Sequence, residues 1–151
     1  MAKEIERKFL VTNPGFKTLS DGSVHISQGY LCRDIDRTVR VRIMGERGFI
    51  TVKSRNHGMT RGEWEYEIPV DEALEMLSLC EHIISKRRWY VRYAGHTWEV
   101  DEFEAPHRGL TIAEVELGCE GETVEAPGFI GEEVTGNPRY YNSTLSAPAD
   151  E

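Results

Sequence analysis

The feature that most constrains the fold of this 151-residue chain is an alternation of charged and apolar residues with a period of two. It is most regular in residues 61–68, which read Arg-Gly-Glu-Trp-Glu-Tyr-Glu-Ile. Successive side chains of a β-strand point to opposite faces of the sheet. The alternation therefore predicts strands that have one ionic face and one apolar face.

The same alternation recurs along the chain, interrupted by segments that contain Gly or Asn at residues 45–48, 56–58 and 95–96. Such residues form the short turns that join antiparallel strands. The pattern predicts strands near residues 3–11, 23–33, 36–45, 48–55, 61–69, 84–93, 96–104 and 111–118. Eight antiparallel strands in one domain favour a closed barrel, because closure removes exposed edges. We expect a mainly β (α+β) fold, with residues 1–151 as a single domain and a few flanking helices.

Helices are expected at three places outside these strands. One follows Pro69, with Asp71 as its N-cap and residues 72–80 as its body. A short second helix is expected over residues 138–145, which begin with a proline suited to a first helical turn. Residues 13–16 predict one further turn of helix.

The charged faces are more ionic than an ordinary solvated face. A single alternating strand usually has one wet and one buried face. Here several strands place like charges two residues apart, and these repel unless opposite charges face them. If all the charged faces point inward, nine acids and seven bases meet in the lumen, and the apolar faces point outward. The acids are Glu4, Glu6, Glu63, Glu65, Glu67, Glu99, Asp101, Glu114 and Glu116, and the bases are Lys8, Arg40, Arg42, Lys53, Arg55, Lys86 and Arg88.

Such a lumen suits a polyanion together with divalent cations. Glu-x-Glu at 4/6, 63/65 and 114/116, and Glu-x-Asp at 99/101, place two carboxylates on one face about 6.5–7 Å apart. Mg²⁺ and Mn²⁺ prefer such oxygen ligands. Arg-x-Arg at 40/42 and Lys-x-Arg at 86/88 offer donors to phosphate oxygens. A purely structural ionic barrel is the bland alternative, but unpaired buried ions are costly.

Composition and motifs exclude several other classes. The net charge of −8 argues against a nucleic-acid coat. The chain has no GxxxxGK[ST], GxGxxG or GxSxG motif, and its five histidines lack the spacing of a zinc site. Three widely spaced cysteines predict reduced thiols. With no signal peptide and no apolar run near the ~18 residues of a membrane span, we expect a cytoplasmic monomer or homodimer that binds neither nucleic acid nor membrane.

The charged pairs follow one another in a recognisable order. The run Glu4-Ile5-Glu6-Arg7-Lys8 is followed by matching motifs at residues 38–42, 51–54, 61–65, 86–88, 99–101 and 113–117, and by the tail 133–142. Over nearly its whole length the chain resembles the CYTH group of triphosphate tunnel metalloenzymes. That group includes class IV adenylate cyclases, thiamine triphosphatases and bacterial inorganic triphosphatases.

The resemblance implies an eight-stranded tunnel in which bases grip a triphosphate and acids hold one or two Mg²⁺ or Mn²⁺ ions. By position, the phosphate ligands would be Lys8, Arg40, Arg42, Lys53 and Arg88. The metal ligands or water activators would be Glu4, Glu6, Glu63, Glu65, Asp101, Glu114 and Glu116. Lys86 is similar to a lysine that narrows one tunnel end together with a tyrosine, here Tyr30. Glu67, Glu99 and Arg55 match no position of the family pattern.

The implied reaction is hydrolysis of a triphosphate by metal-activated water. Arg40 and Arg42 would stabilise the charge on phosphate, and Glu6 or Glu116 would accept the water proton, with Lys8 and Lys86 completing the catalytic set. The short chain favours inorganic tripolyphosphate, cut to pyrophosphate and phosphate. Open alternatives are thiamine triphosphate or nucleoside triphosphate hydrolysis, cyclisation of ATP, and a module that binds polyphosphate or nucleotide without turnover.

Overall fold

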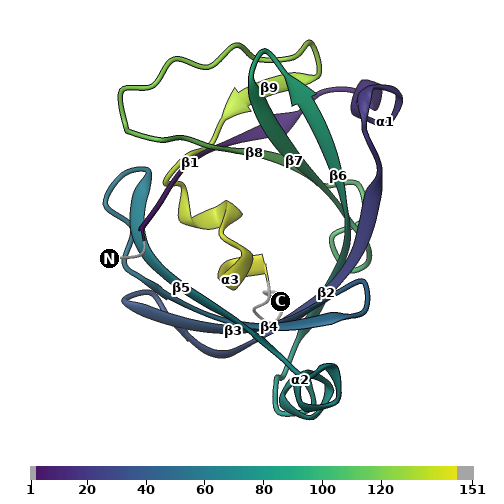
Figure 1. Ribbon diagram of the computed structural model, residues 1–151, viewed down its shortest axis with the longest axis vertical. Helices are drawn as coiled ribbons and strands as arrows, with labels where there is room; N and C mark the ends of the chain where they lie inside the picture. The colour runs from purple at the N-terminus through teal and green to yellow at the C-terminus, as the bar shows by residue number, and fades with distance from the viewer. Residues whose placement is uncertain (1–2, 146–151) are drawn as a thin grey trace.

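The computed structural model describes residues 3–145, and in them nine strands form one antiparallel sheet that closes into a barrel (Figure 1). The strands are β1 (Lys3–Val11), β2 (Ser23–Asp34), β3 (Arg37–Met44), β4 (Arg47–Ser54), β5 (Thr60–Ile68), β6 (Ile83–Tyr93), β7 (His96–Phe103), β8 (Thr111–Glu116) and β9 (Ile130–Glu133). Their order is β5-β4-β3-β2-β6-β7-β8-β1-β9, and pairing of β5 with β1 completes the ring. The predicted eight-stranded barrel is confirmed, and β9 is an addition to it.

Strand β1 closes the barrel by changing partners along its length. Its first residues, from Lys3 to Ile5, pair with β5, while the stretch from Glu6 to Leu10 pairs with β8. Beyond Ile5, β5 no longer pairs with β1, and the short strand β9 pairs with β1 instead, at Phe9 and Val11. The four-residue β9 was not predicted, because so short a strand carries too few alternating positions to be seen in the sequence.

The helices lie where they were expected, with corrections to their ends. They are α1 (Gly15–Leu19), α2 (Val70–Leu77), the 3-10 helix η1 (Pro138–Tyr140) and α3 (Asn142–Leu145). The prediction of Asp71 as N-cap is wrong: Pro69 holds that position, no side chain within residues 3–145 caps the helix, and Asp71 lies in the first turn. A negative charge is favourable there too, because it faces the positive end of the helix dipole. Within residues 3–145 no helix is long and apolar enough to cross a membrane.

The expected bodies of two helices were too long. Helix α2 ends at Leu77, and three turn hydrogen bonds, the last from Cys80 N to Leu77 O at 3.0 Å, replace its predicted last turn. The segment 138–145 is two short helices rather than one. Tyr141 between them is extended, with φ −69° and ψ 139°, and so interrupts the helix.

The main apolar core lies outside the barrel, as the alternation predicted. The outward residues Trp98, Val100 and Val115 are at most 1% exposed. Phe16 of α1 and Phe129 from the chain before β9 cover them, with the two rings 5.9 Å apart and edge to face. Full burial of each such side chain contributes roughly 1.5–3 kcal/mol.

The inner face is not charged along its whole length. Ile84, Phe103 and Ile112 lie two residues from charged positions on the same strands, so they face the lumen, where they form a second apolar cluster. Tyr140 and Leu145 of the C-terminal segment pack against this cluster. In Figure 1 this segment, drawn in yellow, lies within the ring of strands. One end of the lumen is therefore apolar and is closed by residues 138–145.

The outer core generates a stability prediction. Phe129→Ala removes a side chain that is 1% exposed and holds the 118–129 connection against the barrel, so we expect a loss of about 3–5 kcal/mol. Urea unfolding followed by circular dichroism measures it. Tyr66→Ala, at a side chain that is 65% exposed on β5, is the control and should cost under about 0.5 kcal/mol. Equal costs for the two variants would contradict this description of the core.

Candidate active site

The charged faces converge on a cavity of about 220 Å³ inside the barrel. Every barrel strand except β2 contributes to its wall, because barrel closure turns the alternate residues of all strands toward one axis. The wall consists of Glu4, Glu6, Arg40, Arg42, Met44, Lys53, Arg61, Glu63, Glu65, Arg88, Glu99, Glu114, Glu116 and Asn142.

Two residues expected on the inward face, Arg55 and Glu67, lie exposed at strand ends instead of in the lumen. Arg55, just past the end of β4, forms an ion pair with the exposed Asp36. Glu67, near the end of β5, is bound by Arg47 through two hydrogen bonds of 2.6 and 3.1 Å. Both lie at strand ends, where an exposed partner is available, so their expected place in the lumen is wrong.

Three residues of the wall, Met44, Arg61 and Asn142, were not predicted. Met44 is uncharged, so an alternation of charge does not identify it. Arg61 alternates with Glu63, and the same period that identified Glu63 identifies it, although it was not counted among the inward bases. Its Nε lies 3.4 Å from Glu4 Oε1. Asn142 belongs to α3, which enters the lumen from the C-terminal segment, so no strand alternation could reveal it.

Three carboxylates gather at one side of the cavity. Oxygen atoms of Glu4, Glu6 and Glu116 all lie within 4.8 Å of one another. Glu6 and Glu116 are direct cross-strand partners on β1 and β8, and Glu4 precedes Glu6 on the same face. Lys53 Nζ lies 3.0 Å from both oxygens of Glu4 and so orients that carboxylate. Oxygen ligands so arranged fit a hard divalent cation.

The acids of this cluster do not ionise equally. Burial, together with Glu114 and Glu4, raises the pKa of Glu6 well above its usual value. Burial opposes ionisation of Glu114 as well, but the charge of Lys8 and a hydrogen bond with Glu6 lower the pKa of Glu114 far below the usual range. Burial, Glu4 and Glu63 raise the pKa of Glu116 to about 7. The hydrogen bond between the two carboxyl groups therefore favours the proton on Glu6 and the charge on Glu114.

The opposite side of the cavity carries Arg40 and Arg42. Arg40 is held by Thr51 Oγ1 at 3.3 Å and lies 3.6 Å from Glu65. Arg42 forms no ion pair within residues 3–145, and burial, Arg40 and Arg88 lower the pKa of Arg42 to about 9. These two guanidinium groups are poorly neutralised, which is the condition in which they attract an anion.

Asp101, expected among the metal ligands, is bound by two bases. Arg88 donates to its two oxygens at 2.8 and 2.9 Å, and Lys86 Nζ lies 2.6 Å away. Burial alone would raise the pKa of Asp101, but Arg88 and Lys86 lower it below its ordinary value. Asp101 does not line the cavity. Its position is that of a counter-ion for the lysine and the arginine.

Lys8 and Lys86, expected to bind phosphate, are attached to the C-terminal segment. Lys8 Nζ donates to Tyr140 O at 3.1 Å, and Lys86 Nζ donates to Asn142 Oδ1 at 3.0 Å. Burial, with help from Arg88 and Arg42, lowers the pKa of Lys86 to about 7 although Asp101 opposes this. Neither lysine lines the cavity. They lie toward the closed end of the lumen.

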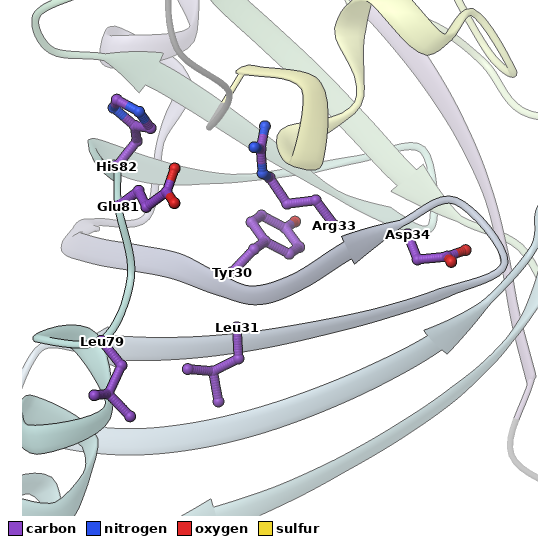
Figure 2. Close-up of a pocket in the computed structure, with 7 residues that line it drawn as sticks. All are labelled: Tyr30, Leu31, Arg33, Asp34, Leu79, Glu81 and His82. Atoms are coloured by element: carbon purple, nitrogen blue, oxygen red, sulfur yellow. The ribbon is translucent and has the colours of Figure 1, made fainter.

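Tyr30 borders a different cavity, of about 330 Å³, beside the end of β2 (Figure 2). Its wall consists of Tyr30, Leu31, Arg33, Asp34, Leu79, Glu81 and His82. Figure 2 shows Tyr30 and Arg33 on one side of β2 and Leu31 on the other. Most of this wall is exposed, and its charges do not converge as those of the lumen do. We therefore assign the active site to the smaller luminal cavity.

Comparison with known proteins agrees with this geometry. The family model of the CYTH domain matches residues 2–147. The chain belongs to the CYTH domain family.

Two relatives match this chain over nearly the full length of both proteins. An inorganic triphosphatase of Acetivibrio thermocellus is 49% identical over 147 residues, which are 96% of this chain and 94% of the relative. An inorganic triphosphatase of Nitrosomonas europaea is 36% identical over 154 residues, covering 95% and 96%.

Solved structures agree as well. A crystal structure of an inorganic triphosphatase has a TM-score of 0.69 at 31% identity and covers 100% of this chain and 99% of its own. A protein from Pyrococcus horikoshii, at 21% identity, has a TM-score of 0.63 over 78% of this chain and 79% of its own, and so shares the fold.

The raised pKa of Glu116 predicts a pH effect on the metal-free protein. In the folded state Glu116 has a pKa near 7 instead of 4.5, so its ionisation destabilises the fold as pH rises through this window. Glu116→Gln should therefore reduce the fall of Tm between pH 5 and 8 in EDTA, measured by differential scanning fluorimetry. Glu132→Gln, outside the barrel on β9, is the control and should leave the slope unchanged. A wild-type slope in Glu116→Gln would contradict the assignment.

Proposed function

We propose that this chain hydrolyses a triphosphate in the luminal cavity and that inorganic tripolyphosphate is its preferred substrate. The observation that carries the proposal is the division of one cavity into a carboxylate cluster, Glu4, Glu6 and Glu116, and a pair of poorly neutralised arginines, Arg40 and Arg42. The inorganic triphosphatases at 49% and 36% identity support it.

Mg²⁺ or Mn²⁺ would be held by Glu4, Glu6 and Glu116, with Glu63, Glu65 and Glu114 in the same wall available for a second ion. When bound, such a cation neutralises phosphate charge and lowers the pKa of a coordinated water molecule. Three converging carboxylates repel one another without a cation, which is why the acid-rich wall favours an enzyme over a pure polyanion receptor.

The chain's own groups would divide the remaining work. Arg40 and Arg42 would hold phosphate oxygens and stabilise the charge that develops during transfer. Lys53 fixes the Glu4 carboxylate, and Asp101 orients Arg88 at the cavity wall. Glu6 or Glu116, through a carboxylate oxygen that the cation leaves free, would accept the proton of the attacking water.

The wall of the cavity favours an inorganic substrate. Among the wall residues within 3–145 only Met44 is apolar and none is aromatic, so this part of the chain offers no surface in the wall on which a nucleobase or a thiazole ring would stack. Lys86 on β6 and the C-terminal segment close one end of the lumen, and Tyr30 lies on β2, the strand that pairs with β6. A short phosphate chain therefore fits the luminal cavity better than a substrate with an organic group does.

The direct test is phosphate release from tripolyphosphate, thiamine triphosphate, ATP and GTP, each with Mg²⁺ or Mn²⁺ and with EDTA. We expect tripolyphosphate to react fastest and EDTA to abolish release, because Glu4, Glu6 and Glu116 need a cation to serve the substrate. Tight binding of tripolyphosphate without release at any metal concentration would favour a receptor. Faster release from ATP would favour a nucleoside triphosphatase.

Substitutions separate the cavity from the rest of the charged faces. Glu6→Gln and Arg40→Ala should each lower kcat/KM by about 10²–10³-fold with folding retained. Glu67→Gln and Arg55→Ala are matched controls, since they change the same residue types outside the cavity and should keep full activity. Full activity of both cavity variants would refute the site.

A further inference from the structure

Strand β2 adds no side chain to the cavity wall, yet it places Gln28 directly beside Arg42. Gln28 is fully buried, and its backbone is in register with Arg42 on β3 and Ile84 on β6. It is a neutral side chain that lies between the charged Arg42 on one side and the apolar Ile84 on the other. Charge pairing therefore does not explain why an amide is buried beside Arg42.

Gln28 holds Arg42 by a single hydrogen bond. Arg42 Nε donates to Gln28 Oε1 at 2.8 Å, and because arginine can only donate, the oxygen of the amide must face it. Within residues 3–145 Arg42 forms no other hydrogen bond and no ion pair, while its side chain lines the cavity. The amide fixes one nitrogen of the guanidinium and leaves the two terminal nitrogens for the cavity.

Arg88 shows what a carboxylate does at the corresponding place. Asp101 takes both Nε and a terminal nitrogen of Arg88, at 2.8 and 2.9 Å, and neutralises its charge. Gln28 takes only Nε and neutralises nothing. In both arginines a side-chain oxygen accepts a hydrogen bond from Nε. The two differ in the positive charge that remains available to a ligand.

We propose that Gln28 is a positioning residue of the triphosphate site, which orients Arg42 through a neutral bond so that its full positive charge serves a phosphate group. The inference rests on the proposed function. It explains why a buried arginine has an amide as its partner, an arrangement that costs stability unless an anion completes it.

A second observation agrees with this role. Gln28 Nε2 and Arg40 Nε are buried donors that have no acceptor within residues 3–145. Buried donors are normally satisfied. Both belong to side chains next to Arg42: Gln28 through its hydrogen bond, and Arg40 two residues away on β3. Among residues 3–145 the surroundings of Arg42 are therefore short of acceptors, which is the condition that a bound anion relieves.

The decisive variant is Gln28→Glu, which keeps the shape of the side chain and adds a carboxylate beside Arg42. The new ion pair should keep Tm at or above the wild-type value, as Asp101 does for Arg88. It should also raise the KM for tripolyphosphate by about tenfold or more, because Arg42 is neutralised. If Gln28 had a purely structural role, KM would instead rise only in a variant whose Tm falls.

Gln28→Met is the second variant. It removes the hydrogen bond without adding charge, and we expect a smaller rise in KM, about threefold, with kcat retained. Thr18→Glu, which adds one negative charge on the exposed surface of α1, is the control for net charge and should leave KM unchanged. Calorimetric titration of inorganic tripolyphosphate into each protein in EDTA measures the same loss of affinity without turnover.

The outcomes are separable. A wild-type KM and wild-type affinity in both Gln28 variants, in a protein that hydrolyses tripolyphosphate, would overturn the positioning role alone. If the wild-type protein neither binds nor hydrolyses tripolyphosphate, the proposed function fails and this inference fails with it.

Discussion

The structure depends on ion pairing inside the lumen. Arg88 and Lys86 bind Asp101, and Lys53 binds Glu4, all with nitrogen-to-oxygen distances between 2.6 and 3.0 Å. Breaking such a buried pair typically costs about 3–5 kcal/mol, because one charge is left without compensation. The barrel can turn its ionic faces inward only because residues far apart in the sequence arrive as partners. The apolar faces are then free to form the outer core around Trp98.

Pairing is incomplete in one region, and that region is the candidate site. Glu4, Glu6 and Glu116 converge with more negative charge than the neighbouring bases neutralise, while Arg42 across the cavity has no acidic partner within residues 3–145. A divalent cation and a phosphate chain would complete both halves at once. The contrast between Asp101 beside Arg88 and Gln28 beside Arg42 decides which arginine supports the wall and which remains available to a ligand.

Much of this arrangement could be predicted from the sequence, because a period of two is a property of each strand. It identified the eight barrel strands and most of the residues that line the cavity, from Glu4 to Glu116. It could not identify Asn142, since α3 reaches the lumen through tertiary packing against Ile84 and Phe103. It wrongly placed Arg55 and Glu67 in the lumen, because alternation does not show that a residue at a strand end forms an ion pair with an exposed partner. Gln28 was overlooked because a single neutral residue carries no pattern.

The central claim is that the carboxylate cluster and the arginine pair form one site for a cation and a phosphate chain. The most direct measurement is a crystal structure of the Glu6→Gln variant with tripolyphosphate and Mn²⁺, using anomalous scattering to locate the metal. The account predicts a manganese peak at Glu4 and Glu116 and phosphate oxygens on Arg40 and Arg42. Manganese or phosphate bound outside the lumen, for example in the cavity beside Tyr30 and Arg33, would contradict it.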